Sequence, residues 1–184
     1  VANRVDLITL RDKDSLEYLR NLGVTRPPLK VTADPVFSLQ PDQEDKATIE
    51  ALLSRLNPGG LPVIGVSVRK WSPLEGYQQD LAQLLDYLAD KKYKILFIPM
   101  AYPEDIAESK RVAHLMKAEA IILEENLTSK EHLSLIANLE LMIGMRLHAL
   151  IFAASRGIPF AGLSYDPKVD AFLKIFNLKP LSGK

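Results

Sequence analysis

Short apolar runs alternate with longer segments of helical periodicity from Leu61 to the end of the chain, and this alternation constrains the fold most strongly. The run Leu61–Val68 (LPVIGVSV) is apolar and β-branched, which is typical of a strand buried on both faces. The segment Tyr77–Asp90 carries leucines at helical spacing, which predicts an amphipathic helix. Repeated strand–helix units of this kind predict an α/β fold, a parallel sheet with helices on both faces.

The same pattern places the other elements. Strands are predicted at Tyr93–Pro99, Ala120–Leu123, Leu139–Ile143 and Phe160–Ser164. Helices are predicted at Glu104–Lys117 and Ser129–Asn138, and a last helix is predicted to end near Asn177. Before Leu61 we expect strand, helix, strand and helix at Val5–Leu10, Ser15–Leu22, Leu29–Ala33 and Glu44–Leu56. The loop Asn57–Gly60 ends the last of these sharply, so residues 1–60 are predicted as a connecting segment and 61–184 as the main domain, together forming one compact unit.

The stretch Leu139–Gly162 (LELMIGMRLHALIFAASRGIPFAG) holds the main candidate site. An apolar run ends at Gly144, and a segment with helical spacing follows. Arg146 and His148 therefore lie at the start of a helix beside the C-terminal end of a strand, where open α/β sheets bind ligands. Free backbone N–H groups, the helix dipole and an arginine fork favour an anion there. The alternative is a solvated arginine and a histidine that packs or caps.

Two further arginines follow predicted strands, so each is a candidate cation for the same ligand. Arg11 is followed by Asp12 and Asp14, and from spacing alone a solvated arginine paired with one of these carboxylates is the stronger interpretation. Arg69 precedes Lys70 and Trp71, and this group could line a ligand site or form a plain exposed loop. Both alternatives stay open for Arg69.

Composition excludes several classes of function. The chain has 23 Lys and Arg against 23 Asp and Glu, without the basic excess that accompanies nucleic-acid binding. It has no cysteine, and hence no disulfide, thiolate metal site or cysteine nucleophile. No signal peptide is visible, and no apolar run reaches the ~18 residues of a membrane span. The sequence lacks the dinucleotide fingerprint, the P-loop and the GxSxG elbow of serine hydrolases. A start at Val1, almost directly before a strand, indicates a fragment of a longer protein.

Several motifs together resemble the polysaccharide pyruvyl transferase family. They are Ile143–Ala149 (IGMRLHA), Gly157–Pro159 (GIP), Ser164–Lys168 (SYDPK), Arg11–Asp12 with Ser15, and Thr32–Pro35 (TADP). The likeness covers most of the chain and is strongest for the subgroup that pyruvylates bacterial cell-wall polymers. It implies two Rossmann-like domains in a glycosyltransferase-B-type arrangement, of which this chain resembles the C-terminal half, with the N-terminal domain as a missing partner.

The resemblance also implies a reaction. Pyruvate moves from phosphoenolpyruvate to two hydroxyls of a cell-surface polysaccharide sugar, presented as a glycan or a lipid-linked saccharide, and forms a cyclic ketal. The resemblance implies that the donor's carboxylate and phosphate are bound by three cations: Arg11, Arg146 and Lys168. We expect Arg69 to be a further binding residue. His148 is the acid–base candidate. No metal or organic cofactor is required. We expect a cytoplasmic protein, or one peripheral at the inner membrane face, and an isolated chain without turnover.

Two other classes of function remain as alternatives. A glycosyltransferase-B or sugar-nucleotide epimerase relative would place a nucleotide diphosphate at the same helix start. A non-catalytic α/β module would bind no anion, and its Arg146 would pair with a nearby carboxylate.

Overall fold

The computed structural model describes residues 1–71 and 76–181, and the chain divides into two compact units, Val1–Leu39 and Gln40–Lys184. No helix among the described residues is both long and apolar enough to cross a membrane.

The first unit is a small strand–helix–strand fold. Strands β1 (Ile8–Leu10) and β2 (Leu29–Val31) pair in parallel, and helix α1 (Lys13–Asn21) connects them. Short 3-10 turns lie at either end, η1 (Ala2–Arg4) and η2 (Pro35–Ser38). The Asn3 side chain closes the unit: its Nδ2 donates to the Gly23 carbonyl at 2.9 Å, and its Oδ1 accepts from the backbone N–H of Thr25 at 2.9 Å.

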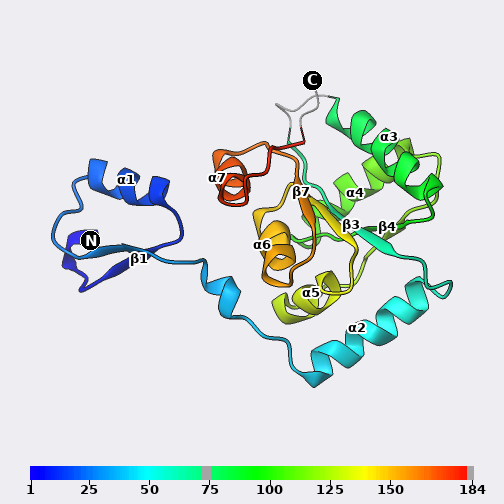
Figure 1. Cartoon of the computed structure of the whole chain (residues 1–184), viewed down its shortest axis with the longest axis horizontal. Coiled ribbons are helices and arrows are strands. Elements are labelled where there is room, and N and C mark those ends of the chain that lie inside the picture. The colour runs from blue at the N-terminus through cyan, green and yellow to red at the C-terminus, as the bar shows by residue number, and fades with distance from the viewer. Residues whose placement is uncertain (72–75, 182–184) are drawn as a thin grey trace. The chain divides into compact units, whose positions relative to one another are not determined.

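The second unit is built on a five-stranded parallel sheet in the order β5-β4-β3-β6-β7. Its strands are β3 (Val63–Ser67), β4 (Lys94–Phe97), β5 (Ile121–Ile122), β6 (Leu141–Gly144) and β7 (Phe160–Gly162). Its helices are α2 (Gln43–Leu56), α3 (Tyr77–Asp90), α4 (Glu104–Leu115), α5 (Ser129–Ile136), α6 (Leu147–Ser155) and α7 (Pro167–Ile175). The predicted α/β class, a parallel sheet with helices on both faces, is confirmed (Figure 1).

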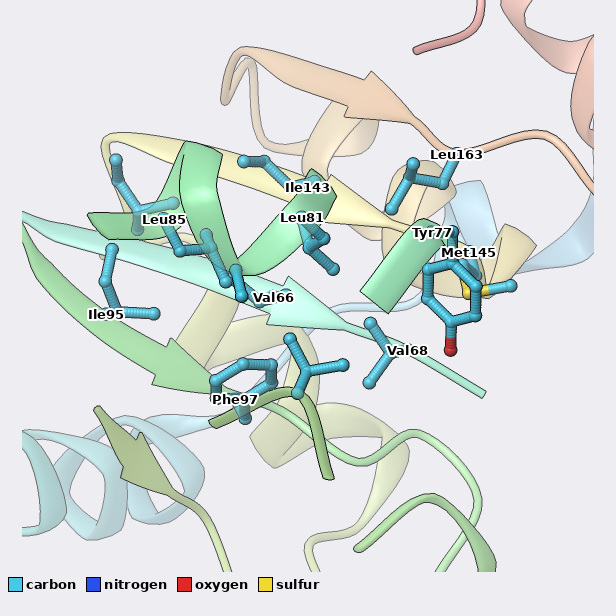
Figure 2. Close-up of a cluster of buried hydrophobic side chains, with 13 residues drawn as sticks. Val66, Val68, Tyr77, Leu81, Leu85, Ile95, Phe97, Ile143, Met145 and Leu163 are labelled. Atoms are coloured by element: carbon cyan, nitrogen blue, oxygen red, sulfur yellow. The ribbon is translucent and has the colours of Figure 1, made fainter. Parts of the chain in front are cut away.

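Alternate residues of the central strands face opposite layers of helices. Val66 of β3, Phe97 of β4 and Ile143 of β6 pack with Leu81 and Leu85 of α3 in one buried cluster (Figure 2). On the other face, two glycines of the sheet allow helices to pack close to it. An added Cβ at Gly144 would lie 3.0 Å from Leu150 of α6, and one at Gly162 would lie 2.9 Å from Leu173 of α7.

The boundary between the units differs from the expected one at residue 60. Helix α2 belongs to the second unit, because it packs against α5 with Ile49 and Leu52 buried. The chain therefore divides at Leu39, before α2, and forms two units instead of the single one expected.

Candidate functional site

The sheet order reverses between β3 and β6, and the candidate residues follow these two strands. The connection after β3 runs through α3 to β4, whereas the connection after β6 runs through α6 to β7 on the opposite side. Open α/β sheets bind their ligands at such a switch point, at the C-terminal ends of the strands. Arg69 lies two residues after the end of β3, and Arg146 lies two residues after the end of β6.

Helix α6 begins at Leu147, so Arg146 and His148 lie at its start. Arg146 is the residue before the first turn, and no side chain caps the helix, so its first N–H groups lack the usual side-chain acceptor. His148 lies in this first turn and is exposed, with its ring centroid 6.5 Å from that of Phe152. The exposed imidazole is therefore accessible to a ligand at this end of the helix.

Arg146 forms a two-pronged ion pair with Asp105 of α4. Its Nε donates to Oδ2 at 2.9 Å and its Nη2 donates to Oδ1 at 2.5 Å. Burial of the guanidinium opposes its charge, but the hydrogen bonds and the charge of Asp105 outweigh that effect and hold the pKa of Arg146 above its ordinary value. The charge of Glu104 acts in the same direction. The carboxylate pairing expected of the non-catalytic module is thus present, whereas His148 is not packed in the core.

Tyr165, just after β7, is the shared contact of two other candidate cations. Arg69 Nη1 donates to the Tyr165 hydroxyl at 3.1 Å, and the Arg69 guanidinium carbon lies 5.1 Å from the centre of the Tyr165 ring. Trp71 packs beside them, with its ring 5.5 Å from the guanidinium carbon and 5.2 Å from the Tyr165 ring. The Nε of Arg69 is buried and lacks a hydrogen-bond partner among the described residues.

Lys168 reaches the same tyrosine from the start of α7. Its Nζ lies 6.0 Å from the Tyr165 ring centre and 3.3 Å from Asp166 Oδ2. Asp166 caps α7 by accepting from the Lys168 backbone N–H at 3.0 Å. This hydrogen bond, helped by the charges of Lys168 and Arg69, lowers the pKa of the Asp166 carboxyl below its ordinary value. Lys168 therefore lies beyond the C-terminal end of β7, at the same edge of the parallel sheet as the end of β6 that precedes Arg146.

A buried hydrogen-bond cluster supports the backbone at the end of β3. The Tyr77 hydroxyl lies 2.6 Å from Glu108 Oε1, to which it donates, and 3.0 Å from the carbonyl oxygen of Arg69. Gln78 and Arg111 also donate to the Glu108 carboxylate. Burial, followed by the hydrogen bond to Glu108, raises the pKa of Tyr77 well above its ordinary value.

Arg11 belongs to the other unit, Val1–Leu39. It forms ion pairs with Asp12 Oδ2 at 3.4 Å and Asp34 Oδ2 at 3.5 Å. Asp12 caps α1 and Asp34 caps η2, so both carboxylates have structural roles within Val1–Leu39.

Two residues of this site were not singled out from the sequence as contact residues. Asp105 has no distinctive signal, since acidic residues are common in the first turn of a helix. Tyr165 lies within the SYDPK motif, and that motif was the available signal. In residues 1–71 and 76–181, no group of three or more His, Asp or Glu side chains is arranged to hold a metal ion.

Solved structures of low sequence identity share this fold. A glycosyl transferase family 9 protein from Veillonella parvula DSM 2008 matches with a TM-score of 0.60 and 18% identity, over 80% of this chain and 41% of that chain. A putative UDP-N-acetylglucosamine 2-epimerase from Listeria monocytogenes matches with a TM-score of 0.60 and 15% identity, over 93% of this chain and 46% of that chain. These matches show the fold alone, that of glycosyltransferase-B enzymes and epimerases.

Sequence comparison identifies a family. The amylovoran biosynthesis protein AmsJ of Erwinia amylovora is 20% identical over 199 residues, which cover 100% of this chain and 48% of that protein. The chain thus spans about half the length of this curated relative. The family model described as polysaccharide pyruvyl transferase matches residues 1–167. The chain therefore belongs to the polysaccharide pyruvyl transferase family.

Proposed function

We propose that this chain binds phosphoenolpyruvate at the C-terminal ends of β3, β6 and β7 and contributes to the transfer of its pyruvyl group to a polysaccharide sugar as a cyclic ketal. The observation that carries the proposal is the presence of one cation after each of these strands: Arg69, Arg146 and Lys168. Tyr165 contacts the first and the last of them. Phosphoenolpyruvate carries a carboxylate and a phosphate, so it needs several cations. Arginine forks match the oxygens of both groups.

The reaction gives each group a defined task. One sugar hydroxyl adds through its oxygen to carbon 2 of the enol and releases its proton, while carbon 3 gains a proton. A second hydroxyl oxygen then bonds to carbon 2, the bond from carbon 2 to the phosphate oxygen breaks, and phosphate leaves as the hydroxyl releases its proton. The cations would stabilise the charge that develops on the departing phosphate.

His148 is proposed as the residue that moves one of these protons. It is exposed in the first turn of α6, two residues after Arg146. An imidazole can donate or accept a proton near neutral pH, which the protonation of carbon 3 requires. The acceptor would be a glycan or lipid-linked saccharide, and family membership supports a polysaccharide substrate.

Calorimetry with three ligands tests the donor. We expect phosphoenolpyruvate to bind, inorganic phosphate to bind more weakly, and a nucleotide-diphosphate sugar to give no competing signal. Arg146→Ala should abolish detectable phosphoenolpyruvate binding, whereas Arg55→Ala should not, because Arg55 pairs with Glu125 on an exposed surface. If only the nucleotide-diphosphate sugar binds, that sugar is the donor, as expected of an epimerase or glycosyltransferase relative. No binding of any anion would favour the non-catalytic module.

A further inference from the structure

Asp105 is a buried carboxylate in the first turn of α4, and its contact with Arg146 is directional. Asp105 is 1% exposed, whereas the Arg146 side chain is 24% exposed. The carboxylate accepts from Nε and Nη2, so it occupies one edge of the planar guanidinium. An arginine bound along one edge can turn only slightly without losing both hydrogen bonds.

The orientation of Asp105 is set by its own helix. Its backbone N–H donates to the Ala101 carbonyl at 2.9 Å, and its Oδ2 accepts from the Ala101 N–H at 3.0 Å. The Ser109 hydroxyl donates to the Asp105 carbonyl at 2.9 Å. The carboxylate is therefore held by the start of α4, and the long side chain of Arg146 is the partner that is being oriented.

The other edge of Arg146 stays available. A guanidinium has five N–H donors, of which Asp105 accepts two. Within residues 1–71 and 76–181, Arg146 side-chain hydrogen bonds are made to Asp105 only, and no nitrogen of Arg146 is among the buried unpartnered atoms. The remaining donors belong to Nη1 and Nη2, the pair that can engage two oxygens of an anion.

We infer that Asp105 is a positioning residue, which holds Arg146 with its Nη1 and Nη2 edge ready to bind the anionic donor. The inference rests on the proposed function, because it assigns the anion to phosphoenolpyruvate. Asp105 does not touch the donor in this scheme; it acts through Arg146. Orientation before binding spares the arginine much of the rotamer freedom that it would otherwise lose when the donor binds.

Asp86 of α3 provides the control. Its carboxylate also accepts from backbone N–H groups, those of Lys117 and Ala118, and it has no contact with the candidate cations among the interactions of the described residues. Asp86→Asn and Asp105→Asn each neutralise one hydrogen-bonded carboxylate, and both should lower the thermal midpoint. A purely structural role for Asp105 would give both variants the same donor affinity.

The test measures phosphoenolpyruvate and phosphate affinity by calorimetry on the 184-residue chain, at temperatures where each variant is folded. We expect Asp105→Asn to weaken phosphoenolpyruvate binding by about 10- to 100-fold, and Asp86→Asn to change it by less than about threefold. In an Arg146→Lys background, Asp105→Asn should cause little further loss, because it acts through the arginine fork. The signal of the Arg146 Nε–H in nitrogen-15 NMR should exchange faster with solvent in Asp105→Asn than in Asp86→Asn.

The possible outcomes separate the two proposals. Tight binding by Asp105→Asn, with loss of binding in Arg146→Ala, would overturn the role of Asp105 and leave the proposed donor intact. Additive losses in the Arg146→Lys background would also overturn it. If the unmodified chain binds phosphate but not phosphoenolpyruvate, the proposed donor fails, and the phosphate affinities of the same variants decide the role of Asp105. If neither ligand binds, both proposals fail.

Discussion

Lys168 is the candidate cation whose contribution a single substitution can isolate. Its side chain is 38% exposed, and its ammonium pairs with Asp166 at the start of α7, so its removal leaves no unpaired charge in the core. Lys168→Ala should weaken phosphoenolpyruvate binding by ~1–3 kcal/mol, the usual range for a lost charged hydrogen bond. Calorimetry measures this loss directly. Lys174→Ala, in the last turn of the same helix, is the control, and equal affinities of the two variants would remove Lys168 from the donor site.

Tyr77 links the stability of the fold to alkaline pH. Its pKa is raised in the folded chain by burial and by Glu108, whereas an unfolded tyrosine titrates near pH ~10. The contribution of the neutral phenol is fully present below pH ~10 and declines above it, because the unfolded state releases a proton that the folded state retains. Above that pH, the free energy of unfolding should fall more steeply with pH in the unmodified chain than in Tyr77→Phe. The difference between the two slopes should be up to ~1.4 kcal/mol per pH unit.

Urea unfolding at several pH values between neutrality and pH ~11 checks the role of Tyr77, since the affected window begins near the ordinary tyrosine pKa. Tyr87→Phe serves as the control, because Tyr87 is on the same helix and 58% exposed. Its curve should run parallel to that of the unmodified chain. A Tyr77→Phe curve that is equally parallel would show that the phenol does not carry this pH dependence.

Individual positions in the site could be predicted from sequence, but their partners could not. A strand end followed by a helix start places Arg146 at the C-terminal edge of the sheet whatever surrounds it. The carboxylate that it binds lies 41 positions earlier, and no periodicity relates the two residues. The contact of Arg69 with Tyr165 likewise depends on the sheet order, in which only β6 lies between β3 and β7. Lys168 contacts the same tyrosine.

At the scale of the elements, strong helical periodicity predicts the bounds of a helix well, whereas a short apolar run does not predict the bounds of a strand. Helix α3 is predicted and found at Tyr77–Asp90, because a full leucine face defines it. Strand β1 was expected from Val5 but covers Ile8–Leu10, since it pairs with a partner of three residues, β2. A strand's length is set by its neighbour, and the neighbour is not visible in the strand's own sequence.

Close packing at Gly65 makes β3 sensitive to one added methyl group. A Cβ there would lie 2.5 Å from Leu139 Cδ1 and 3.0 Å from both Ile98 Cδ1 and Met142 Sδ. Gly65→Ala should therefore lower the free energy of unfolding by ~1–3 kcal/mol, the usual cost of overpacking. Urea denaturation measures it against Gly59→Ala, which meets nothing within 4 Å and should be nearly neutral. Equal stability of the two variants would mean that the neighbours of Gly65 move aside freely.

At the scale of the whole molecule, the two units differ greatly in the core that they can form. Val24 is the one buried hydrophobic residue of Val1–Leu39, whereas the large, fully buried side chains of the described residues all lie from Ile49 onward. A unit of this size buries too little apolar surface to be stable alone. The second unit has its own core of strands and helices, and it holds Arg69, Arg146, His148 and Lys168.

This division allows the role of Arg11 to be tested with the rest of the site intact. A chain of residues 40–184 should keep the urea midpoint of the second unit, because none of the core residues of that unit comes from Val1–Leu39. If Arg11 binds the donor, as family resemblance implies, the truncated chain and Arg11→Ala should lose phosphoenolpyruvate affinity to the same extent, by ~1–3 kcal/mol. Arg26→Ala, in the same unit, should bind as the unmodified chain does. Full affinity in the truncated chain would place the whole donor site in the second unit and leave Arg11 as the partner of Asp12 and Asp34.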